Sequence, residues 1–79
     1  MYKYQRLKDL REDCDLKQES IARMLNTTKQ QYSLYETGKR EIPFHHVITL
    51  ACFYKVSIDY IAGLTNEKRS GEKTEKKGF

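Results

Sequence analysis

The sequence predicts an all-α fold of five short helices followed by a charged tail. Apolar residues recur at spacings of three and four, and no stretch alternates apolar and polar residues as a half-buried strand does. The chain of 79 residues allows one domain with a single small core. We therefore expect one domain over residues 1–65. Residues 66–79 carry many charges and one apolar residue, so we expect a disordered tail there.

The first two helices are predicted over residues 4–13 and 18–25. Asp15 is a candidate for the break between them, and Asn26 is expected to end the second helix, because Asn tolerates a left-handed backbone. The residues expected to face inward are Tyr4, Leu7 and Leu10 in the first helix and Ile21, Ala22, Met24 and Leu25 in the second.

A third helix is predicted over residues 28–36. A threonine hydroxyl at position 27 or 28 would cap its start, and Gly38 would stop it with a left-handed residue. Tyr32 and Tyr35 lie three residues apart, so we expect both to face the core with their hydroxyls reaching the surface. A role as stacking platforms for bases is the alternative.

The fourth and fifth helices follow a basic loop. Pro43 suits the first position of the fourth helix, where its missing N–H is of no consequence. Ser57 is expected to cap the fifth helix, and Gly63 to mark its end. The residues expected to face inward are Phe44, Val47, Ile48, Ala51 and Tyr54 in the fourth helix and Ile58, Ile61 and Leu64 in the fifth.

The segment from Gln18 to Tyr35 reads as two helices joined by a tight turn. Ala22 is small enough for the two helices to approach closely, and Asn26 suits the turn. The start of the second of these helices carries Lys29, Gln30, Gln31 and Ser33, whose side chains offer hydrogen-bonding groups. This combination is typical of a helix-turn-helix that places a helix in the major groove of DNA.

This segment, with YETGKREIP at residues 35–43 and KVSIDYIAGLT at residues 55–65, resembles the lambda-repressor-like, Cro-type (XRE) helix-turn-helix family. The resemblance extends from Leu7 to Leu64. It implies a five-helix domain that acts as a sequence-specific transcriptional regulator, more a repressor than an activator, and not as an enzyme. The same fold can instead bind a protein partner, as an antitoxin does, and this alternative stays open.

The resemblance also implies roles for individual residues. The base-facing positions are Thr28, Lys29, Gln30, Ser33 and Leu34, and the phosphate-facing positions are Gln18, Gln31, Lys39 and Arg40. Arg11 and Glu36 match an ion pair that bridges the first and third helices, with two solvated charges as the alternative. Gln pairs with adenine and Lys reaches guanine, whereas Leu34 offers contact only to a thymine methyl or a sugar.

Other classes of function find little support in the sequence. His45 and His46 are adjacent rather than spaced as metal ligands, and Cys14 and Cys52 lie far apart, so we expect no metal, no cofactor and no small-molecule ligand. No apolar run is long enough to span a membrane, and free thiols suit the cytoplasm. A net charge of +4 suits double-stranded DNA as the partner. A homodimer would place two half-sites about 34–36 Å apart.

Overall fold

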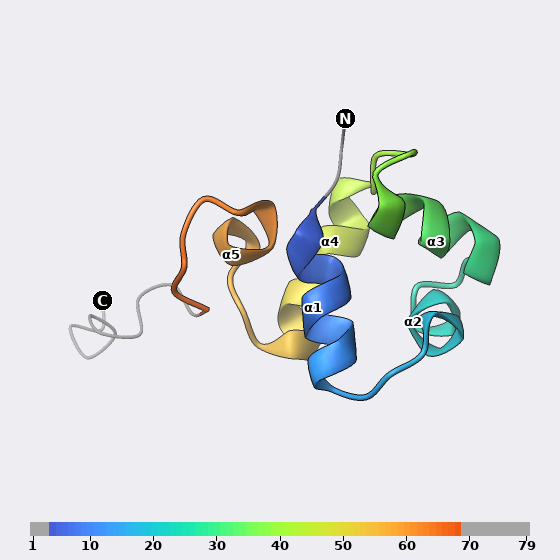
Figure 1. Ribbon diagram of the computed structural model, residues 1–79, viewed down its shortest axis with the longest axis horizontal. Helices are drawn as coiled ribbons and strands as arrows, with labels where there is room; N and C mark the ends of the chain where they lie inside the picture. The colour runs from blue at the N-terminus through green and yellow to red at the C-terminus, as the bar shows by residue number, and fades with distance from the viewer. Residues whose placement is uncertain (1–3, 69–79) are drawn as a thin grey trace.

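The computed structural model describes residues 4–68, which form five α-helices and no strand, as the sequence predicted. The helices are α1 (Gln5–Asp13), α2 (Gln18–Met24), α3 (Lys29–Thr37), α4 (Phe44–Tyr54) and α5 (Ile58–Ala62). The most extensive contact between helices joins α2 and α3, while α5 packs against both α1 and α4. Helix α1 therefore lies in the middle, with α2 and α3 on one side and α5 on the other (Figure 1).

One buried cluster receives side chains from all five helices and from the loop before α4. Its members are Leu7, Leu10, Ile21, Ala22, Leu25, Tyr32, Tyr35, Ile42, Val47, Leu50, Ala51 and Ile61. The rings of Tyr32 and Tyr35 meet edge to face at 6.3 Å, so both tyrosines pack in the core as predicted. The predicted surface position of the hydroxyls is wrong for Tyr32, whose hydroxyl is fully buried.

The helix ends follow the local signals in the sequence. The backbone is left-handed at Asp15, Asn26, Gly38 and Gly63, the four positions predicted to break or end helices. Thr28 Oγ1 accepts a hydrogen bond from Gln31 N, and Ser57 Oγ accepts one from Tyr60 N, as helix caps do. Lys55 is a further left-handed residue and ends α4, which the sequence analysis did not anticipate.

The inward face of α4 was predicted wrongly at two positions. Phe44 and Ile48 are 63% and 42% exposed, whereas Leu50 is completely buried beside Val47 and Ala51. The helix reads FHHVITLACFY, so apolar side chains surround most of its circumference. Its periodicity therefore does not select one face, and packing against the other helices makes the choice.

Three further predictions about buried side chains and helix ends were wrong. Leu64 is 77% exposed because the left-handed Gly63 ends α5 before it. Met24 is also exposed, at the end of α2. Pro43 precedes the first residue of α4 as its N-cap, with extended backbone angles (φ −60°, ψ 145°), rather than occupying the first helical position.

The chain that follows α5 is held against α1 by one arginine. Arg6 Nη1 donates to the carbonyl oxygens of Tyr60 at 2.9 Å and Thr65 at 2.5 Å, and its Nη2 donates to Asn66 Oδ1 at 2.7 Å. The same guanidinium lies 4.1 Å from the centre of the Tyr60 ring. The predicted tail begins at this attachment, and residues 69–79 lie outside the described residues.

Candidate nucleic-acid interface

The turn between α2 and α3 sets the angle at which α3 is presented. Ala22 is 2% exposed, and its carbonyl oxygen accepts a hydrogen bond from Thr27 N at 2.9 Å. Leu25 N donates to Ile21 O at 2.9 Å, after which the left-handed Asn26 reverses the chain. A larger side chain at Ala22 would push α3 away from α2, so the small residue matters for this geometry.

Four of the five predicted base-facing residues lie together on the outer side of α3. Lys29, Gln30, Ser33 and Leu34 line one shallow surface hollow of about 490 Å³. Gln18 from the start of α2 completes its lining. The hollow therefore combines amide, ammonium and hydroxyl groups with one apolar side chain.

Thr28, the fifth predicted base-facing residue, has a structural task as well. Its Oγ1 accepts the cap hydrogen bond from Gln31 N at 3.1 Å. The hydroxyl proton of Thr28 stays available for an acceptor outside the protein, because a hydroxyl both accepts and donates. Gln31, predicted to face phosphate, is half-buried in the same turn.

The basic loop after α3 is tied to the middle of the base-facing surface. The carbonyl oxygen of Leu34 accepts hydrogen bonds from Lys39 N at 3.0 Å, Arg40 N at 3.2 Å and Thr37 Oγ1 at 3.3 Å. Gly38 makes this close return possible with a positive φ of 82°. The backbone of Lys39 and Arg40, whose side chains are exposed, is thus held at a fixed offset from Leu34.

The structure contains the ion pair between Arg11 and Glu36. Arg11 Nε lies 2.7 Å from Glu36 Oε2, and Nη2 donates to Oε1 at 3.2 Å. The two side chains are only 12% and 3% exposed, so they are not two solvated charges. The hydrogen bond to Glu36 raises the pKa of Arg11. Burial opposes ionisation of Glu36, but hydrogen bonds from Arg11 and Gln18 outweigh it, aided by the nearby Tyr32 hydroxyl, and lower the pKa of Glu36.

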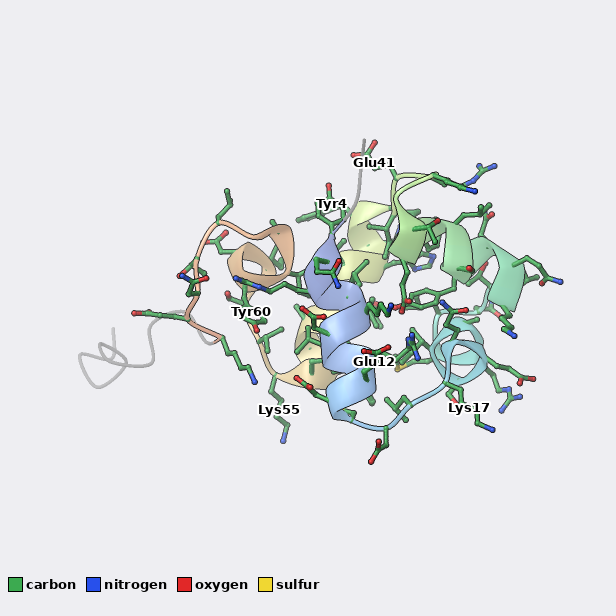
Figure 2. The ribbon with its side chains drawn as sticks, in the orientation of Figure 1. Tyr4, Glu12, Lys17, Glu41, Lys55 and Tyr60 are labelled. Atoms are coloured by element: carbon green, nitrogen blue, oxygen red, sulfur yellow. The ribbon has the colours of Figure 1, made fainter. Side chains whose placement is uncertain are left out.

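Two features of this surface were missed by the sequence analysis. Gln18 Nε2 donates to Glu36 Oε1 at 3.0 Å, so the residue predicted to face phosphate also joins the buried ion pair. Lys17, the N-cap of α2, lines a second hollow with Gln18 and Lys29 and adds a cation to this side of the molecule. Figure 2 shows Lys17 on the outer side of α2, away from Lys55 and α5. Its position next to Gln18 was the only signal in the sequence.

The remaining reactive groups do not assemble into a site. The rings of His45 and His46 lie 4.2 Å apart, and burial together with the charge of His45 lowers the pKa of His46. Cys14 and Cys52 are exposed free thiols. Among residues 4–68, no group of three metal-ligating side chains gathers in one place. In the same range, every helix is too short or too polar to cross a membrane.

Two helices joined by a left-handed turn, the second exposing a polar surface beside a basic loop, define a helix-turn-helix domain. Comparison with known proteins agrees, since the helix-turn-helix family matches residues 7–61. The chain therefore belongs to this family, and its resemblance to the lambda-repressor-like, Cro-type group is confirmed. The family also bears out the prediction that the chain is not an enzyme.

Two curated relatives come from Bacillus subtilis (strain 168). The uncharacterized HTH-type transcriptional regulator YobD is 38% identical over 63 residues, covering 80% of this chain and 56% of the relative. The uncharacterized HTH-type transcriptional regulator YqaE is 36% identical over 63 residues, covering 78% of this chain and 54% of the relative. The chain thus spans little more than half the length of these relatives. No solved structure gives a significant match.

Proposed function

We propose that the chain is a sequence-specific DNA-binding regulator of transcription, of the repressor type, which docks α3 in the major groove. The observation that carries this proposal is the hollow formed by Lys29, Gln30, Ser33 and Leu34, with the basic loop bonded to the Leu34 carbonyl. The names of YobD and YqaE, both HTH-type transcriptional regulators, support it. The proposed localisation is the cytoplasm.

Base reading is assigned to the outer side of α3. Gln30 can pair with the N6 and N7 positions of adenine, and Lys29 can reach O6 and N7 of guanine. Leu34 lies one turn after Gln30, so it would meet a base further along the groove. As an apolar group it suits the methyl group of thymine. Thr28 and Ser33 supply hydroxyls on either side.

Phosphate contacts are assigned to residues that flank this surface. Gln18 lies at the start of α2, where the helix dipole favours an anion. Lys39 and Arg40 extend from the loop beyond the end of α3, and Gln31 lies in its first turn. Contacts of this kind fix the register of the protein on the duplex without reading sequence.

A homodimer is part of the proposal. Phe44, Ile48 and Leu64 are exposed apolar side chains of α4 and of the turn after α5. Helix α5 lies on one side of α1, and α2 and α3 lie on the other (Figure 1). A second copy that packs against the α5 side would therefore leave the DNA-facing side free. Two recognition helices would then meet half-sites about 34–36 Å apart on a pseudo-palindrome.

Selection of bound duplexes from a random pool, followed by titrations of affinity against salt, tests this function. Gln30→Ala should lower affinity for the selected site by about 1–3 kcal/mol and change affinity for unrelated DNA little. Arg40→Gln should weaken both and reduce the salt slope by about one. Lys55→Gln removes the same charge far from α3 and should leave the slope unchanged.

Three results would contradict the proposal in different ways. Failure to bind any duplex at about 50 mM salt would leave the protein-binding alternative, such as an antitoxin. Equal losses for Gln30→Ala on both DNAs would remove Gln30 from base reading. A selected motif without two-fold symmetry would argue against the dimer.

A further inference from the structure

Gln18 stands where two parts of the DNA-facing surface meet. On one side it lines the hollow with Gln30 and Leu34 on α3. On the other it lines a hollow of about 340 Å³ formed with Lys17 and Lys29. The half-buried side chain of Gln18 is therefore placed between the base-facing surface and a second hollow, which Lys17 and Lys29 line together with Glu19.

The direction in which the Gln18 amide points is set by a buried carboxylate. Glu36 is ionised, because its pKa is lowered, and an ionised carboxylate only accepts hydrogen bonds. The nitrogen of the amide, rather than its oxygen, must therefore face Glu36, and Nε2 donates to Oε1 at 3.0 Å. A primary amide nitrogen carries two N–H groups, so the second stays available for an acceptor outside the protein.

Glu36 is itself held in place by Arg11. Arg11 donates to both carboxylate oxygens, at 2.7 and 3.2 Å, and its Nη1 donates to the carbonyl oxygen of Leu16 at 2.8 Å. Leu16 lies two residues before Gln18, so the start of α2 is bonded through its backbone to Arg11 and through a side chain to Glu36. The guanidinium also neutralises the carboxylate, which limits its repulsion of a nearby phosphate.

We propose that Glu36 is a positioning residue that orients the Gln18 amide toward a DNA phosphate. Glu36 lies in the last turn of α3, two residues after Leu34, so a change in the orientation of α3 would displace the amide as well. The phosphate contact made by α2 is thereby coupled to the placement of the recognition helix. Holding the amide before DNA arrives also lowers the entropy lost on binding. This inference rests on the proposed function.

A double-mutant cycle on DNA affinity tests the coupling. Gln18→Ala should weaken binding to selected and unrelated duplexes alike, by about tenfold to 150-fold, as expected for one hydrogen bond to a charged group. Glu36→Gln lets the Gln18 amide adopt either orientation, so it should weaken binding by about twofold or more, twofold being the loss for two equally populated orientations. In the Gln18→Ala background, Glu36→Gln should have little further effect.

The matched control is Gln31→Ala, which removes the other glutamine proposed to face phosphate. Gln31 lies in the first turn of α3, where its backbone N–H is bonded to Thr28, so its effect and that of Glu36→Gln should multiply in full. If the fold-losses of DNA affinity for Gln18→Ala and Glu36→Gln multiply in the double variant, the coupling is overturned. Unchanged affinity of Gln18→Ala, with intact binding by the wild type, would overturn the phosphate contact and leave the proposed function standing.

A measurement on the wild-type protein covers the case in which Glu36→Gln fails to fold. The two Nε2 protons of Gln18 give separate NMR signals because rotation about the amide C–N bond is slow. Unrelated duplex DNA should shift the outward proton strongly and the proton bonded to Glu36 little. Equal shifts of both protons, or no shift while the duplex is bound, would overturn the inference.

Discussion

Replacing Arg11 by methionine leaves the Glu36 carboxylate buried without its cation. Breaking a buried pair in this way costs about 3–5 kcal/mol. We expect the lower end, about 3 kcal/mol near pH 7, because Gln18 still donates to Glu36 and methionine fills part of the space. A domain of this size has a total stability of about 3–10 kcal/mol, so the variant should be close to unfolding at room temperature.

The loss should depend on pH in a direction that follows from the pKa of Glu36. In the wild type this pKa is lowered, so the pair stabilises the fold fully above the unfolded value of about 4.3 and less as the pH falls through the folded value. Without Arg11, burial should raise the pKa of Glu36. As the pH falls, protonation of Glu36 then removes the unpaired buried charge, so the variant loses less stability. The difference in unfolding free energy between wild type and Arg11→Met should therefore shrink toward about pH 4.5.

Urea unfolding followed by far-ultraviolet circular dichroism, at about pH 7.5 and pH 4.5, measures this difference. Glu36→Gln is the control. It removes the buried carboxylate and leaves Arg11 an amide oxygen as acceptor, so its loss should be smaller and nearly independent of pH. A loss for Arg11→Met that is equal at both pH values, or smaller than that of Glu36→Gln, would refute the reasoning.

Two further predictions concern the core and the base-facing surface. Leu50→Ala should lower the unfolding free energy by about 2–5 kcal/mol because Leu50 is completely buried, whereas Leu64→Ala should change it by less than about 0.5 kcal/mol. Urea unfolding of the pair checks this, and similar losses would contradict the burial of α4. Replacing one thymine of the selected half-site by deoxyuracil removes a methyl group and should weaken binding about fourfold. The same replacement should have no effect on Leu34→Ala, and an undiminished effect there would exclude Leu34 as the reader of that methyl.

Most helix boundaries could be predicted because their causes are local, although the left-handed Lys55 that ends α4 was missed. Asn26, Gly38 and Gly63 adopt left-handed angles that other residues avoid, and Thr28 and Ser57 cap helices with their own hydroxyls. Each of these effects acts within about four residues of chain. A single sequence therefore contains all the information that such a prediction requires.

The inward face of α4 could not be predicted in the same way. Phe44 and Ile48 fit the helical period as well as Leu50 does, but only Leu50 is buried. The difference arises from how α5 and the rest of the buried cluster pack against α4, which depends on contacts distant in sequence. Hydrophobic period alone decides a face only when the opposite side is polar.

The same contrast applies to the candidate site. The family resemblance grouped Lys29, Gln30, Ser33 and Leu34 as base-facing residues of one helix, and the structure places them around one hollow. The bond from Gln18 to Glu36 joins residues 18 apart in sequence. Neither residue carries a sequence signal for that bond, because glutamine and glutamate are common on solvated helix surfaces.

The last turn of α3 holds the neighbouring elements in place through two hydrogen-bond acceptors. The Leu34 carbonyl holds the basic loop, and the Glu36 carboxylate holds α1 through Arg11 and α2 through Gln18. The residues proposed to contact phosphate on both sides of α3 are therefore positioned by hydrogen bonds to the same two residues, Leu34 and Glu36. A net charge of only +4 suffices on this view, because the cations and amides are held in register with the base-facing side chains rather than accumulated in number.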